Sequence, residues 1–186
     1  MQTAGTDSQS EAFLLLLAQQ EKIRANKVPG VRIVLVILSA RAMVFDTESL
    51  KQKILLSYPE TAVFFMTTSG KPIGLAPPKQ VDLLIDFTGP GQRQGLFFAK
   101  KLRTMARVAT GRNAGFFRSR IYDRVFDEKT KTVSGVGTKV LDPLERERQI
   151  QREVLALAGI ALAQMGDTPP DRGKTIALEL PALQRL

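Results

Sequence analysis

Arginines and lysines are concentrated in one part of this sequence, residues 91–131. This stretch holds eleven basic residues against three acidic ones, so it carries +8 of the net charge of +9 of the whole chain. Charge concentrated in this way usually meets an anion, and the planar guanidinium group of arginine suits phosphate and carboxylate groups. Four arginines around a glycine-containing loop are the first candidates for anion binding: Arg112, Arg118, Arg120 and Arg124.

An acidic residue and a glycine-rich turn come just before most of this positive charge. Asp86 lies near the end of the apolar run over residues 81–87, and the turn over residues 89–95 contains Arg93. A carboxylate at a strand end either caps the next turn or takes part in a ligand site, and both interpretations stay open for Asp86. Asp86 and Arg93 therefore join the candidate anion site.

The glycines of this turn are only loosely similar to a dinucleotide-binding turn. Pro90 lacks the amide that would bind a phosphate, and no carboxylate follows about 20 residues later in the position that binds the ribose. The pattern favours a plain turn from strand to helix over a nicotinamide site. We therefore predict no cofactor.

Missing residue types exclude several kinds of chemistry. The chain has no cysteine and no histidine, which excludes disulfides, zinc sites of the usual ligand types, thiol nucleophiles and imidazole bases. We predict no metal site, and catalysis would have to use carboxylates, lysine, arginine, hydroxyl groups or backbone amides.

No apolar run approaches the roughly 20 residues of a membrane-spanning helix, and the first residues lack the basic region of a secretory signal. We expect a cytoplasmic protein, with peripheral contact at the inner face of the membrane as an open alternative.

Apolar periodicity predicts the elements that position these residues. Residues 1–10 are small and polar and are expected to form a disordered tail, and residues 11–30 are expected to form a helix that Pro29 and Gly30 end. Residues 32–38 contain a continuous apolar run rich in β-branched residues, which is typical of a central parallel strand. The broad apolar face of the first helix contains Phe13, Leu14, Leu16, Leu17 and Ile23.

Helices and strands are expected to alternate after the first strand. The first of these helices is expected to be capped by Asp46 or Thr47. It is followed by a strand over residues 61–67, a connector rich in proline and glycine over residues 70–78, a strand over residues 81–87 and a helix over residues 93–103. Further strands are expected over residues 106–110 and 121–126. A last helix is expected to start with Asp142 and Pro143, to run to about Gln164 and to end at Gly166.

This alternation predicts an α/β fold, a Rossmann-like three-layer sandwich with a mainly parallel sheet over residues 31–166. Residues 167–186 are expected to form a C-terminal extension. Ligands of such sheets bind outside the carboxyl ends of the strands, so residues 39–46 and 86–95 are expected at the functional edge.

Several of these segments together resemble a known family. The apolar run over residues 81–89, a helix with Leu96, Ala99 and Leu102, and the segments 106–111 and 122–125 resemble the N-terminal domain of family 9 glycosyltransferases, the ADP-heptose:lipopolysaccharide heptosyltransferases. The helix ending in Tyr58-Pro59 and the helix ending in Gly159-Ile160 fit the same order. The resemblance covers about residues 31–160 and implies one half of a GT-B fold.

The resemblance implies a role in binding the acceptor. In that family the N-terminal domain binds the anionic inner core of lipopolysaccharide, and a second domain binds the ADP-sugar donor. This chain is therefore expected to be inactive alone, with a separate donor-domain chain as a partner. The family's catalytic aspartate follows the first strand; here Asp46 is the candidate, although it comes a few positions later.

Two function classes remain open at this stage. The chain is either the acceptor-binding half of a heptosyltransferase-like enzyme or a non-catalytic α/β module. Such a module would bind an anionic partner: a glycolipid, a membrane surface, a nucleic acid or an acidic protein.

Overall fold

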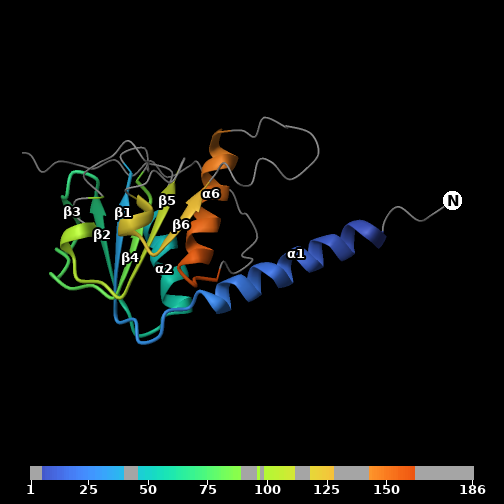
Figure 1. Ribbon diagram of the computed structural model, residues 1–186, viewed down its shortest axis with the longest axis horizontal. Coiled ribbons are helices and arrows are strands. Elements are labelled where there is room, and N and C mark those ends of the chain that lie inside the picture. Colours follow the sequence, from blue (N-terminus) through green and yellow to red (C-terminus); the bar gives the residue numbers. More distant parts are fainter. Residues whose placement is uncertain are drawn as a thin grey trace, which may run out of the picture.

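A mainly parallel β-sheet forms the centre of the structure (Figure 1). The computed structural model describes residues 6–39, 46–88, 96, 99–111, 118–127 and 143–161. Within these residues six strands form one sheet in the order β3-β2-β1-β4-β5-β6, and every neighbouring pair is parallel except β2 and β3. The strands are β1 (Ile33–Leu38), β2 (Ala62–Thr67), β3 (Pro72–Ile73), β4 (Leu83–Asp86), β5 (Ala106–Gly111) and β6 (Arg124–Asp127).

β1 is the central strand that the sequence predicts. It pairs with β2 on one side and with β4 on the other, and its residues from Val34 to Leu38 are all buried. Successive side chains of a strand point to opposite faces of the sheet. Accordingly, Val34 and Val36 belong to one core cluster, and Leu35 and Ile37 belong to another. A continuous apolar run is needed here because both faces of the strand are covered.

Helices cover both faces of the sheet. On the first face, α2 (Thr47–Ser57) and α6 (Pro143–Leu157) bury residues such as Ile54 and Leu155. On the second face lie the helical residues 99–101 and the short helix α4 (Arg118–Ile121). The predicted α/β fold with a mainly parallel sheet is confirmed at this level.

The first helix differs from its prediction. α1 (Thr6–Ala25) includes residues 6–10, which the sequence analysis placed in a disordered tail. Extending an existing helix adds one hydrogen bond for each residue fixed, so a helix that has started continues readily through polar residues. Figure 1 shows α1 running outward from the sheet, in blue.

The last helix ends earlier than predicted. Its first residue is Pro143, as expected, but its last is Leu157 instead of about Gln164. Gly159 adopts a left-handed conformation with φ of 71°, and its N–H donates to the carbonyl of Ala156 at 3.1 Å. The N–H of Ile160 donates to the carbonyl of Leu155 at 2.9 Å, which completes a Schellman motif. This motif ends the helix before Gly166 is reached.

Two smaller differences lie in the connections between strands. The segment over residues 70–78, predicted as a connector, contains the short antiparallel strand β3. The strand predicted over residues 121–126 is divided, because residues 118–121 form α4 and the strand β6 starts at Arg124. The predictions for residues 93–95, for the helix N-cap at Asp142 and for the C-terminal extension lie outside the described residues.

Candidate anion site at the carboxyl edge of the sheet

Asp86 is the last residue of β4, and its side chain is fully buried. One carboxylate oxygen, Oδ1, accepts the N–H of Thr88 at 2.7 Å, so the carboxylate caps the turn after the strand. The other oxygen, Oδ2, accepts the hydroxyl of Tyr122. Nη2 of Arg118 lies 3.8 Å from Oδ2 and donates to Oγ1 of Thr88 at 2.9 Å. We call Asp86, Thr88, Arg118 and Tyr122 the Asp86 cluster.

Burial controls the electrostatics of this cluster. It raises the pKa of Asp86 above its usual value, although Arg118 and the hydrogen bonds from Thr88 and Tyr122 act in the opposite direction. Burial and the neighbouring Asp86 likewise raise the pKa of Tyr122. The guanidinium carbon of Arg118 also lies 5.5 Å from the centre of the Tyr122 ring. The cluster is a buried polar network that connects β4 to α4.

The cluster joins two residues, Thr88 and Arg118, that flank other segments of the chain. Thr88 is the last described residue before the segment that contains Arg93, and Arg118 is the first described residue after the segment that starts at Arg112. Both segments follow strands at the carboxyl edge, because β4 ends at Asp86 and β5 ends at Gly111. The predictions for Arg93 and Arg112 themselves lie outside the described residues.

Arg124 has a different position from Arg118. Within the sheet, Arg124 is paired with Val108 of β5, and Asp86 is paired with Ala109 of the same strand. Val108 and Ala109 are neighbours that point to opposite faces of the sheet, into the first and the second core cluster. Arg124 and the Asp86 cluster therefore lie on opposite faces. Its Nη1 donates to the carbonyl oxygens of Asn26, at 2.5 Å, and Leu157, at 3.0 Å. A cation at the carboxyl ends of α1 and α6 is favourable, because helix carbonyls carry negative partial charge there.

A third arginine of the basic stretch also contacts backbone carbonyls. Arg107 lies on β5; its Nε donates to the carbonyl of Ala99 and its Nη2 to that of Leu102, both at 3.1 Å. Arg107 belongs to the basic stretch, but no local pattern of the sequence indicates this contact. The side chain of Arg120, on α4, is exposed.

Asp46 is the N-cap residue of α2. Its backbone is extended, and its Oδ1 accepts the N–H of Glu48 at 3.0 Å. An aspartate in this position satisfies one of the free N–H groups at the start of a helix. The capping role predicted for Asp46 is therefore present, and its catalytic role stays a prediction.

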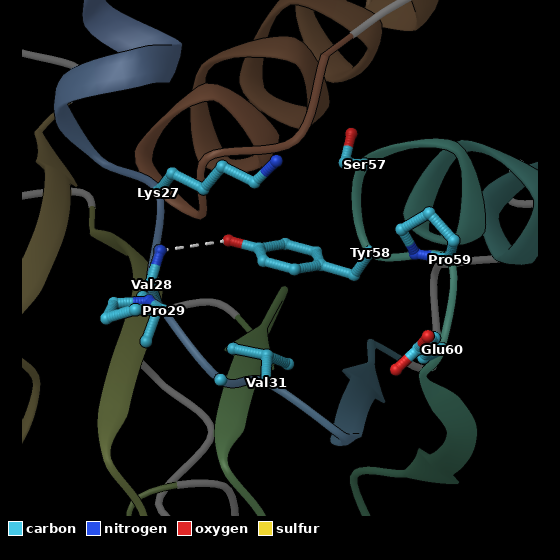
Figure 2. Close-up of a pocket in the computed structure, with 9 residues that line it drawn as sticks. Lys27, Val28, Pro29, Val31, Ser57, Tyr58, Pro59 and Glu60 are labelled. Carbon is cyan, nitrogen blue, oxygen red and sulfur yellow. Dashed lines mark hydrogen bonds between the residues drawn. The ribbon is translucent and has the colours of Figure 1, made fainter.

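A pocket of about 610 Å³ lies at the other edge of the sheet, next to the start of β1 (Figure 2). Tyr58 lies across it. Its hydroxyl accepts the N–H of Val28 at 3.1 Å and donates to the carbonyl of Ala158 at 2.9 Å, and burial raises its pKa. Figure 2 shows Lys27 beside the Tyr58 ring, with Nζ 5.7 Å from the ring centre. The tyrosine hydroxyl thus joins three segments of the chain, the link before β1, the end of α2 and the end of α6.

In the described part of the chain, no group of three or more acidic residues is placed to hold a metal ion. No described helix combines the length and the apolar character that crossing a membrane requires. Comparison with protein-family models, with curated proteins and with solved structures finds no match to this chain.

Proposed function

We propose that this chain binds an anionic glycolipid acceptor, one that bears phosphate or carboxylate groups, at the carboxyl edge of its sheet. The observation that supports this proposal best is the Asp86 cluster, which joins the end of β4 and Thr88 to Arg118 on α4. The sequence resemblance to the N-terminal domain of family 9 glycosyltransferases suggests the ligand class. On this proposal the sheet is one half of a GT-B fold.

The fold supports a ligand at this edge. The order of the parallel strands, β2-β1-β4-β5-β6, places β4 next to the centre of the sheet. Parallel α/β sheets bind ligands outside the carboxyl ends of their strands. In the sequence, Arg112 directly follows β5, and Arg93 lies between β4 and β5. Both arginines are therefore assigned to the rim of the site.

The contacts of the arginines divide their roles. Arg118 and Arg124 bind groups of the protein itself, so we assign them to positioning rather than to ligand contact. We assign direct contact with the anion to Arg93 and Arg112, which follow β4 and β5 in the sequence, and to Arg120, whose side chain is exposed on α4. A guanidinium group can donate two parallel hydrogen bonds to a phosphate or carboxylate, which gives a shaped site and not only charge attraction.

Binding to a phosphorylated glycolipid across a salt series tests the proposal. The variant Arg112→Glu/Arg120→Glu should weaken binding by about tenfold or more, because two donors become repulsive. Arg32→Glu/Lys79→Glu is the matched control: it changes the net charge equally, but both residues are exposed and precede β1 and β4, at the other edge. This control should bind like the unchanged chain.

Equal weakening by the two double variants would contradict a site at the carboxyl edge. DNA is a useful second probe, since generic charge attraction to DNA falls steeply with salt and ignores base sequence. We expect the glycolipid signal, and not the DNA signal, to persist near physiological ionic strength.

A non-catalytic anion-binding module is the second candidate function. The capping contact of Asp46 favours the non-catalytic function. Oδ1 of Asp46, the candidate catalytic base, already accepts a hydrogen bond from the N–H of Glu48. Such a module would need no donor-domain partner. A separate donor-type chain that restores sugar transfer when mixed with this one would decide for the enzyme half.

A further inference from the structure

The outer part of α1 carries large apolar side chains that the described residues do not cover. The exposed fractions are 59% for Phe13, 63% for Leu14, 72% for Leu15 and 44% for Leu17. Figure 1 shows this part of the helix extending beyond the sheet and α6. We call residues 13–17 of α1 the apolar arm. Four exposed apolar residues in one helical turn and a half form a patch that marks an interaction surface.

The base of the arm is held firmly, so its direction is set by the fold. Nζ of Lys22 forms an ion pair with Oε2 of Glu153 on α6 at 2.7 Å, and both side chains are partly buried. Arg124 binds the carbonyl of Asn26, just after the helix. A helix rises about 1.5 Å per residue, so Leu15 lies about 10 Å beyond Lys22 along the axis. The arm is thus presented away from the domain.

The apolar arm does not have the pattern of a helix that lies on a membrane surface. Residues 13–17 are consecutive and successive residues are about 100° apart, so apolar groups point to every side of the helix. A helix that lies on a membrane has one apolar side and a polar side rich in lysine and arginine. The charged residues of α1 after the arm are of both signs: Glu21 is acidic, and Lys22 and Arg24 are basic. They do not form the basic cluster that such a membrane helix has.

We propose that the apolar arm is a dimerisation surface, on which α1 of a second copy of this chain packs in the antiparallel direction. The charge order along the helix supports this direction. The acidic residues Asp7 and Glu11 precede the arm, whereas two basic residues, Lys22 and Arg24, and one acidic residue, Glu21, follow it. Antiparallel packing brings opposite charges together and opposes the helix dipoles, whereas parallel packing brings like charges together.

The symmetry of such a pair defines the contacts. In a two-fold antiparallel pair the residue on the axis meets its own copy, and Leu15 is the midpoint of the arm. Leu14 and Leu16 then lie on either side of that contact, because successive residues are about 100° apart around the helix. Because α1 extends to Thr6, its outer end reaches the level of Lys22 of the second copy, where that helix joins α6. The interface would therefore include α6 as well as the paired helices.

Measuring the mass of the full chain in solution over a concentration series tests the dimer. We expect twice the chain mass of 20.5 kDa. The variant Leu14→Glu/Leu15→Glu should raise the dissociation constant about 30-fold or more, since central apolar contacts dominate such interfaces. The control Leu75→Glu changes a side chain that is 80% exposed and outside α1, and it should leave the dimer intact.

Single-cysteine variants test the direction of packing, because the chain has no cysteine of its own. Leu15→Cys should cross-link to itself under mild oxidation. Arg24→Cys should not, because antiparallel packing about Leu15 separates the two copies of residue 24 by about 27 Å. Equal cross-linking of both variants would overturn the antiparallel arrangement.

Three other results would also overturn the proposal. The first is a single-chain mass at all concentrations, and the second is a dimer that the arm variant does not weaken. The third is arm-dependent flotation of the single chain with phosphatidylcholine vesicles, which would identify lipid as the partner. None of these measurements depends on the anion site, so failure here is distinct from failure of the proposed function.

Discussion

At the scale of single residues, the main feature is a carboxylate buried with a guanidinium group. Asp86 is fully buried and Arg118 is 2% exposed, and the two are connected directly and through Thr88. Removing one partner of a buried pair leaves the other charge in the protein interior, which is more costly than losing a surface ion pair. The stability of this part of the molecule therefore depends on the whole cluster.

Replacing Arg118 should destabilise the protein strongly. We expect Arg118→Ala to lower the free energy of unfolding by about 3–5 kcal/mol, because Asp86 is left buried without its cation. Arg120→Ala is the matched control on the same helix; its side chain is exposed, and its effect should stay within about 0.5 kcal/mol. Urea denaturation of both variants measures the difference. Similar decreases in the free energy of unfolding for the two variants would show that the buried pair of Asp86 and Arg118 does not stabilise the protein more than a surface residue does.

The pH dependence of stability should reveal the state of Asp86. Its pKa is raised in the folded protein, so the folded state binds a proton more readily than the unfolded state does. The resulting stabilisation is present below the unfolded pKa of about 3.9 and is lost as the pH rises through the folded pKa. Relative to Asp86→Asn, the unchanged chain should therefore become more stable as the pH falls from 7 toward about 4. A change in the opposite direction would mean that Arg118 outweighs burial.

At the scale of elements, the end of α6 connects several parts of the structure. Gly159 ends the helix in a left-handed conformation, and a Cβ atom on it would lie 2.6 Å from Cα of Lys27. The close approach lets the link between α1 and β1 pass directly against the end of α6. Tyr58 and Arg124 bind carbonyls at the same junction. The junction thus needs glycine for both its backbone conformation and its lack of a side chain.

Two glycines with similar conformations allow these effects to be separated. Gly30 has φ of 69°, and nothing lies within 4 Å of a Cβ atom built on it. Gly30→Ala should therefore cost only the conformational penalty of about 1–2 kcal/mol. Gly159→Ala should cost clearly more, because its Cβ also meets backbone atoms that cannot move aside easily. Thermal unfolding of both variants provides the measurement, and equal costs would argue against the close approach.

At the scale of the whole molecule, the two proposals use different parts of the chain. The anion site is proposed at the carboxyl edge of the sheet, and the dimer surface is proposed on the outer part of α1. The side chains that connect α1 to the domain, Lys22 and Arg124, do not belong to the Asp86 cluster. Variants of one surface should therefore leave the function of the other unchanged.

The chain alone should transfer no sugar from ADP-heptose and should bind ADP only weakly. The reason is that the proposed function gives this chain the site for the acceptor and not the site for the nucleotide-sugar donor. Calorimetry with ADP checks this expectation. Micromolar binding, about −8 kcal/mol, would mean that this chain corresponds to the donor half instead.

The sequence alone determined the alternation of helices and strands, because local periodicity records which faces are covered. The β-branched run of β1 indicated a strand buried on both sides, and Pro143 marked the start of α6. The strand that ends at Asp86 was also visible as an apolar run closed by a carboxylate. Composition likewise located the positive charge in residues 91–131.

Only the tertiary structure decided how the charges are used. Arg118 and Arg124 look alike in the sequence, but they lie on opposite faces of the sheet. Arg118 pairs with Asp86, and Arg124 binds a backbone carbonyl 98 residues away in the sequence. The contact of Gly159 with Lys27 and the exposure of residues 13–17 on α1 are also products of packing. Local sequence patterns determine which residues share a face. The partner across that face depends on how distant segments come together, which no local pattern records.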